Sequence, residues 1–117
     1  MIEPPIGLTD RRRSLFDKIV ARVRIHMPEP GQRSGCWEWT GPDSGTGRGG
    51  GYGRLCVDGA TMAVHIVMWV IFNGPVPPRK QIDHTCNRRR CCNPEHLEMV
   101  THKRNQRRRD ERRKLAA

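Results

Sequence analysis

The first clear hydrophobic pattern lies between residues 10 and 25, where apolar side chains recur every three or four positions. This spacing is typical of an amphipathic helix that packs through one face. Thr9 or Asp10 can cap its first turn, and the prolines and glycine of 28–31 favour a stop, so we predict a helix to about Ile25. The apolar stripe consists of Leu15, Phe16, Ile19, Val20 and Val23.

Shorter alternating patterns follow and predict strands. Residues 36–40 and 52–57 alternate like half-buried strands. Asp58-Gly59 is a strong hairpin turn that leads into a partner strand over 60–63. We therefore expect a β-hairpin in the first half of the chain.

The most apolar segment covers residues 64–72, where His65 is the one polar side chain. We predict a buried helix that stops at Asn73-Gly74, although the β-branched residues leave a strand open as the alternative. His65 is interpreted as a core or hydrogen-bonding histidine.

Two short strands, 81–84 and 97–100, flank a polar loop, and a very basic helix begins near Thr101, its predicted N-cap. Helices and strands together predict an α+β fold. We expect a leader and amphipathic helix over 1–30 and a main domain over 31–117 that includes the basic helix.

The charge balance points to a polyanionic partner. Lys and Arg number 22 against 12 Asp and Glu, a formal net charge of +10. Nucleic acid is the commonest such partner, and a merely solvated basic face is the plainer alternative. Aromatic residues are 5%, too few to suggest a platform that stacks single-stranded bases.

The cysteines favour a reducing compartment and metal binding. The chain has five, an odd count, and it opens without a hydrophobic secretory segment. No apolar run reaches the roughly 18 residues of a membrane span. We therefore expect an intracellular protein that is not secreted and does not contact a membrane. Cys56, between Leu55 and Val57, is predicted to be a small buried hydrophobe.

Three residues of the kind that bind metal ions lie around one small loop. Cys86, Cys91 and His96 are the soft or borderline ligands that hold zinc. Cys36 or Cys92 could complete the set. Cys36 is preferred because adjacent cysteines project in different directions on an extended backbone. Four protein ligands would make such a zinc site closed and structural.

Hard ligands lie beside this set. Asp83 and Asn105 offer the oxygen atoms that magnesium prefers, and His84 could act as a base on water. His102 is a competing ligand that we rank second to Asn105. This combination argues for a metal-dependent nuclease.

A family resemblance becomes specific at this point. The segment Asp83-His84-x-Cys86-x4-Cys91-x-Asn93-Pro94-x-His96-Leu97, with Asn105 beyond it, resembles the HNH endonucleases of the zinc-containing kind, close to the His-Cys box homing endonucleases. Cys36-Trp37-x-Trp39, Tyr52-Gly53-Arg54 and Ala63-Val64-His65 are similar to that family too. The resemblance covers roughly residues 36–105. It implies a ββα-metal (His-Me finger) core of two strands, a loop and a helix around one divalent ion.

The resemblance also implies roles for individual residues. His84 would be the general base, and Asp83 and Asn105 would bind a catalytic Mg²⁺ or Mn²⁺. Asn93 would be a structural and orienting residue of the catalytic set. A structural Zn²⁺ would take Cys36, Cys86, Cys91 and His96.

The expected substrate is double-stranded DNA, bound mainly through its phosphates. The basic residues expected to bind it are Arg54, Arg88, Arg89, Arg90, Lys103, Arg104, Arg107 and Arg108. Arg54 stands in because the chain departs from the family's pattern elsewhere. Ile66 occupies a position that is Arg in many relatives, and Thr61 and Met62 occupy the hairpin region where His-Cys box enzymes carry an arginine.

The expected protein is thus a DNA endonuclease acting in the cytoplasm of a bacterial host or its equivalent. A nicking enzyme of phage or homing type fits this expectation, and restriction and defence are open alternatives. One such site cuts one strand, so a double-strand break needs a homodimer or two successive events. The competing hypotheses are a noncatalytic zinc-stabilised DNA-binding protein and, more weakly, an RNA-binding protein of ribosomal type.

Overall fold

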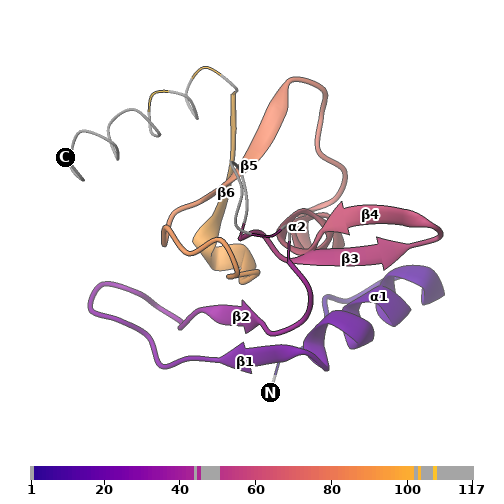
Figure 1. The fold of residues 1–117 in the computed structure, drawn as a ribbon, viewed down its shortest axis with the longest axis horizontal. Coiled ribbons are helices and arrows are strands. Elements are labelled where there is room, and N and C mark those ends of the chain that lie inside the picture. The colour runs from indigo at the N-terminus through magenta and orange to yellow at the C-terminus, as the bar shows by residue number, and fades with distance from the viewer. Residues whose placement is uncertain (1, 44, 46–50, 102, 104–106, 108–117) are drawn as a thin grey trace.

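The computed structural model describes residues 2–43, 45, 51–101, 103 and 107. Its elements are α1 (Asp10–Val20), β1 (Val23–Ile25), β2 (Trp37–Trp39), β3 (Arg54–Val57), β4 (Ala60–Ala63), α2 (Val64–Asn73), β5 (Lys80–His84), the 3₁₀ turn η1 (Pro94–His96) and β6 (Leu97–Thr101) (Figure 1). The fold is α+β, as predicted. The hairpin, the buried helix and the two later strands begin and end within two residues of their predicted bounds.

The first helix is shorter than the sequence pattern predicts. It begins after Thr9, whose side chain accepts a hydrogen bond from the Arg12 backbone, and it ends at Val20 instead of Ile25. Val23–Ile25 form β1, which pairs with β2 in the register Val23↔Trp39. Val23 and Ile25 are β-branched, and β2 offers a ladder partner, so tertiary pairing overrides the helical periodicity.

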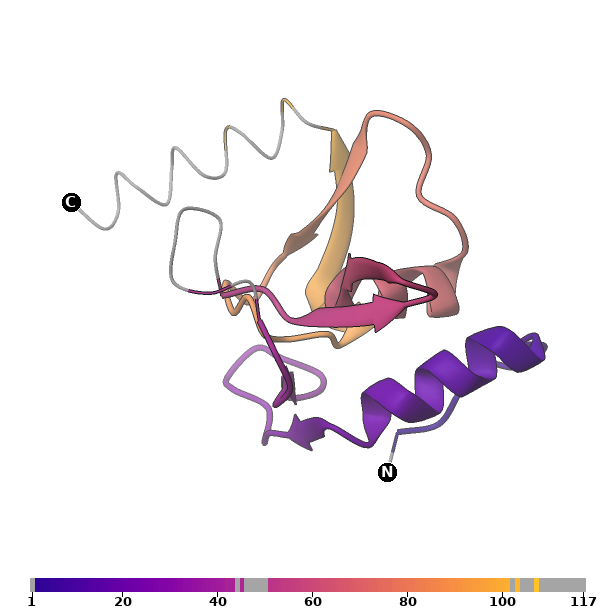
Figure 2. The same ribbon diagram turned by 45° about the vertical axis from the view of Figure 1, so that its right-hand side comes forward.

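Within the described residues the strands form three antiparallel two-stranded sheets, β1–β2, β3–β4 and β5–β6. The β5–β6 register runs from Lys80↔Thr101 to His84↔Leu97. The helix predicted from residue 101 lies mostly outside the described residues, although Lys103 and Arg107 are helical. Figure 2 shows that the connection from α2 enters β5 at the end far from the loop that leads to η1.

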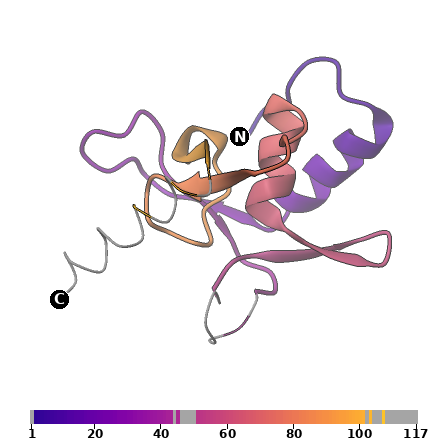
Figure 3. The ribbon, with the colours of Figure 1, turned by 90° about the horizontal axis from the view of Figure 1, so that it is seen from above.

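One hydrophobic core joins the N-terminal helix to the rest of the domain. Helices α1 and α2 lie side by side (Figure 3). The Phe16 and Phe72 ring centroids are 6.1 Å apart. Trp37 approaches Phe72 at the same centroid distance of 6.1 Å. The buried members of this core are Ile2, Phe16, Ile19, Trp39, Leu55, Val57, Val64, Val67, Met68, Ile71 and Cys92. Among the described residues, no helix has the length and apolar character to cross a membrane.

Trp39, the last residue of β2, is fully buried beside the start of the β3–β4 hairpin. Its Nε1–H donates to the Pro42 carbonyl at 2.8 Å. A Cβ atom on Gly53 would lie 2.6 Å from the indole, and one on Gly41 would lie 2.5 Å from it. The two glycines therefore allow the backbone to close on the ring.

Cys56 is exposed, contrary to the prediction that it is a buried hydrophobe. Leu55 and Val57 face the core from β3, and side chains alternate along a strand. Cys56, between them, must therefore point away from the core.

We predict that Gly53→Ala destabilises the fold, because the added methyl group overlaps an indole that has no room to move. The expected loss is about 1–3 kcal/mol in the free energy of unfolding, measured by urea denaturation. Cys56→Ala, a change on the exposed face of the same hairpin, is the control and should stay within about 0.5 kcal/mol of wild type. Equal stability of the two variants would contradict the packing described for Trp39.

Candidate functional site

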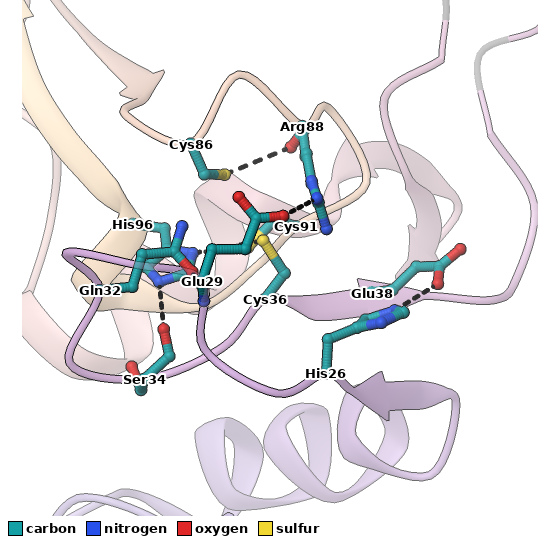
Figure 4. A network of polar contacts seen from close by, with 10 residues as sticks. All are labelled: His26, Glu29, Gln32, Ser34, Cys36, Glu38, Cys86, Arg88, Cys91 and His96. Atoms are coloured by element: carbon teal, nitrogen blue, oxygen red, sulfur yellow. Dashed lines mark hydrogen bonds and ion pairs between the residues drawn. The ribbon is translucent and has the colours of Figure 1, made fainter.

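Three cysteines and one histidine point toward one another beneath the loop that follows β5 (Figure 4). Cys36 precedes β2, Cys86 follows β5, Cys91 closes the loop and His96 ends η1. Their sulfur and nitrogen atoms all lie within 4.8 Å of one another. The structure thus assembles the four ligands expected from the sequence, and it selects Cys36 over Cys92, whose side chain packs in the core.

The spacing of this cluster fits a tetrahedral zinc ion. His96 Nδ1 lies 3.4 Å from Cys36 Sγ and 3.5 Å from Cys91 Sγ. Zinc bonds of about 2.3 Å to sulfur and about 2.05 Å to nitrogen, at tetrahedral angles, place these atoms about 3.6 Å apart. These two pairs are therefore already at the spacing of zinc ligands, and the cluster could hold the ion.

The protonation of the cluster also suits a metal. His96 Nε2 lies 2.7 Å from the Ser34 carbonyl, which accepts its hydrogen, so in the neutral ring the lone pair of Nδ1 faces the sulfurs. The side-chain contact with Cys91 lowers the pKa of Cys86 to about 5. The same contact, together with burial, raises the pKa of Cys91. One thiolate is thus present near neutral pH, and the thiolate is the form that binds metal.

Asn93 joins the two chain segments that carry the ligands. Its Nδ2 donates to Ser34 Oγ at 2.9 Å and to the Gly35 carbonyl at 2.8 Å. Its Oδ1 accepts from the Glu95 backbone at 3.0 Å and caps η1. These bonds hold the segment before Cys36 against the turn that carries His96.

Strand β2 pairs with the loop on its other edge. The Trp39 N–H donates to the Arg90 carbonyl at 2.8 Å, and the Cys92 N–H donates to the Trp37 carbonyl at 2.9 Å. These two hydrogen bonds involve the residues on either side of Cys91 and so fix its backbone against β2. The loop is thus held in place by backbone hydrogen bonds as well as by the cluster.

The three loop arginines occupy different environments. The Arg90 guanidinium donates to the carbonyls of Trp39 and Gly41 and pairs with Asp43 at 2.9 Å. Arg88 pairs with Glu29, and the Arg89 guanidinium carbon lies 5.1 Å from the centre of the Tyr52 ring. Arg90 is therefore held against β2, whereas Arg88 and Arg89 are exposed.

His84, the last residue of β5, is 4% exposed and hydrogen-bonds to this loop. Its Nε2 lies 2.9 Å from the backbone oxygen of Cys91. A carbonyl can only accept, so the ring hydrogen belongs on Nε2 and Nδ1 carries the lone pair. A neutral imidazole of this tautomer can accept a proton at Nδ1.

Two further rings surround His84. The His65 ring centroid is 4.6 Å from that of His84, and the Tyr52 centroid is 5.3 Å from His65 and 5.7 Å from His84. Burial, followed by the nearby His84, lowers the pKa of His65 to about 3, so His65 is neutral in the folded protein. His65 is buried, as expected, and it also contacts the predicted base. The sequence motif Tyr52-Gly53-Arg54 included Tyr52 but did not predict its contact with His84.

Asp83 lines a cleft of about 610 Å³ beside these rings. Arg54, at the start of β3, and His65 line the same cleft. Arg79 and Lys80 line it too, although neither is among the predicted DNA-binding residues. Their position directly before the Asp83 strand was the available signal. A buried carboxylate thus faces a cleft whose wall carries three cationic side chains.

Part of the predicted site lies outside the described residues. These positions are Asn105, His102, Arg104 and Arg108. Lys103 and Arg107, from the same basic segment, are described and exposed.

A family profile and several phage proteins resemble this chain. The profile described as HNH endonuclease matches residues 62–107. The chain is similar to Protein 2.8 of Escherichia phage T7, with 34% identity over 93 residues that cover 78% of this chain and 56% of that protein. It is also similar to Protein 7.7 of the same phage, with 37% identity over 70 residues, or 60% and 51% of the two chains.

A third relative is the uncharacterized gene 5.3 protein of Enterobacteria phage T3, with 44% identity over 36 residues, or 31% of this chain and 36% of that protein. The chain spans about half the length of the two T7 relatives that it matches. No solved structure matches it. The family match covers both Asp83-His84 and the loop with three of the four clustered ligands, and it supports the assignment of this chain to the HNH endonuclease family.

Proposed function

We propose that this protein is a metal-dependent endonuclease that hydrolyses phosphodiester bonds in double-stranded DNA. The observation that carries the proposal is the hydrogen bond from His84 Nε2 to the Cys91 carbonyl. It orients an imidazole with an unprotonated Nδ1, next in sequence to a buried carboxylate in a basic cleft. A site that hydrolyses phosphodiester bonds requires a base of this kind, a carboxylate that can hold a metal ion, and cationic groups for the phosphate.

His84 acts as the general base in this proposal. Its Nδ1 takes a proton from a water molecule as the water oxygen bonds to phosphorus. The bond from phosphorus to the 3′ oxygen breaks, and that oxygen acquires a proton from solvent. The products are a 5′-phosphate and a 3′-hydroxyl.

Asp83 and Asn105 would hold the catalytic Mg²⁺ or Mn²⁺, with His102 as the second choice in place of Asn105. The carboxylate of Asp83 fits a hard ion, and its cleft is open to the substrate. When bound, such an ion stabilises negative charge on the phosphate and on the departing oxygen. The family's spacing supports Asn105, and the antiparallel β5–β6 pair supports a ββα-metal core.

A structural zinc ion bound by Cys36, Cys86, Cys91 and His96 completes the proposal. Four protein ligands leave no position for substrate water, which is why zinc is assigned to the frame and not to the reaction. Zinc would also fix Cys91, whose carbonyl orients His84.

Basic side chains would bind the DNA phosphates with little sequence preference. Those proposed are Arg54, Arg88, Arg89, Lys103 and Arg107, with Arg104 and Arg108 from the same basic segment. Arg90 is omitted because its guanidinium is already bound to β2 and Asp43. The similarity to bacteriophage proteins supports action inside a bacterial host.

His84→Ala should lower the rate of plasmid nicking by a factor on the order of 10²–10⁴, because the reaction loses its base. The assay follows supercoiled plasmid with Mg²⁺ or Mn²⁺ and separates nicked from linear product. His26→Ala is the matched control, since His26 bonds to Glu38 on β2 and does not line the Asp83 cleft. Wild-type protein that binds DNA but never cuts it would favour the noncatalytic DNA-binding hypothesis.

The zinc assignment is tested with two cysteines of different environment. Purified wild-type protein should contain about one zinc ion per chain, and Cys86→Ser should lose the ion and unfold at a much lower temperature. Cys56→Ser, at an exposed position outside the cluster, should keep both properties. Elemental analysis and thermal denaturation provide the readouts. A folded wild-type sample without zinc would refute the assignment.

A further inference from the structure

Arg79 adopts a backbone conformation that an arginine rarely takes. Its φ angle is +68°, in the left-handed region. Elsewhere in the described chain, the non-glycine residues with positive φ are Asp58 and Asn87, whose short polar side chains tolerate it. The Lys80 N–H donates to the Pro77 carbonyl at 3.3 Å and closes a turn with Pro78 and Arg79 at its centre. Proline followed by a positive φ is the pattern of a type II turn, where glycine is the favoured residue in place of Arg79.

This turn, residues 77–80, forms one wall of the Asp83 cleft. Arg79 and Lys80 are both exposed, and neither forms an ion pair within the described part of the chain. Strain retained at the edge of a candidate active site commonly has a functional cause, since a glycine there would relieve it. Here the residue with the unfavourable φ angle is Arg79, and its cationic side chain forms part of the cleft wall.

The turn also lies opposite the other basic group of the site. Figure 2 shows the connection from α2 meeting β5 at one end, with the loop of Arg88 and Arg89 beyond the other end. The strand from Lys80 to His84 spans about 13 Å at roughly 3.3 Å per residue. Phosphates of one DNA strand succeed one another at about 3.4 Å of axial rise. Basic groups at both ends of β5 can therefore contact different phosphates of one duplex.

We propose that the 77–80 turn is a phosphate-binding wall, in which Arg79, supported by Lys80, binds the DNA backbone on the side of Asp83 away from the Arg88–Arg89 loop. This inference rests on the proposed function, because it takes double-stranded DNA as the substrate of the cleft. It explains why an arginine occupies a turn position that favours glycine.

The test measures binding of duplex DNA by fluorescence anisotropy, in a His84→Ala background, over a range of salt concentrations. Adding Arg79→Gly should reduce the slope of log affinity against log salt by about 0.9, the value for one lost phosphate contact. At 0.1 M salt the affinity should fall up to about eightfold, with the difference vanishing near 1 M. Because glycine suits the turn, the Tm should equal or exceed that of the parent.

Two variants serve as controls. Arg24→Ala removes an exposed charge from β1, outside the cleft, and should leave the salt slope unchanged. Arg79→Lys keeps the charge and should retain most of the slope. Weaker binding by Arg79→Gly together with a lower Tm would overturn the proposal, since the arginine would then act through the fold.

The inference and the proposed function can fail separately. If wild-type protein nicks plasmid and Arg79→Gly binds with the parent's salt slope, the phosphate-binding wall is refuted and the nuclease stands. If duplex DNA is bound with the predicted loss of slope but wild-type protein nicks nothing in Mg²⁺ or Mn²⁺, the wall stands and the nuclease is refuted. If the His84→Ala parent does not bind duplex DNA at all, the proposed phosphate-binding role of the 77–80 turn is refuted.

Discussion

The arrangement of this site depends on the backbone carbonyl of Cys91. The same residue contributes its sulfur to the cysteine–histidine cluster and its oxygen to His84. One short loop therefore links the scaffold to the group proposed to carry out the chemistry. A shift of the loop would move the hydrogen-bond acceptor that selects the tautomer of His84, even if the imidazole itself stayed in place. In the proposed function, one peptide unit would therefore couple metal binding to catalysis.

The loop needs this anchoring because it has little hydrophobic core of its own. The apolar core gathers α1, α2, β2 and the β3–β4 hairpin, and from the loop only Cys92 enters it. Residues 86–96 are instead held by the β2 ladder, by the three hydrogen bonds of Asn93 and by the cluster. Polar contacts and a metal can position a small domain's loop where buried apolar area is insufficient.

Residue type alone does not tell what an arginine does in this protein. Arg90 binds carbonyl oxygens and stabilises β2, whereas its neighbours Arg88 and Arg89 are exposed. Arg79 lies in a strained turn at the cleft, where local rules favour glycine. The five donors of a guanidinium suit both carbonyls and phosphates, so its surroundings decide which it contacts.

The sequence by itself determined the ligand types and their spacing, the β3–β4 hairpin, α2 and the β5–β6 pair, because these follow from local periodicity, turn residues and donor chemistry. It also favoured Cys36 as the fourth ligand of the cluster. Tertiary structure decided where α1 ends, since Val23–Ile25 form a strand only because β2 lies beside them. It likewise brought His65 and Tyr52 against His84, and Arg79 to the Asp83 cleft. Those outcomes depend on contacts between residues distant in the chain, which no local pattern encodes.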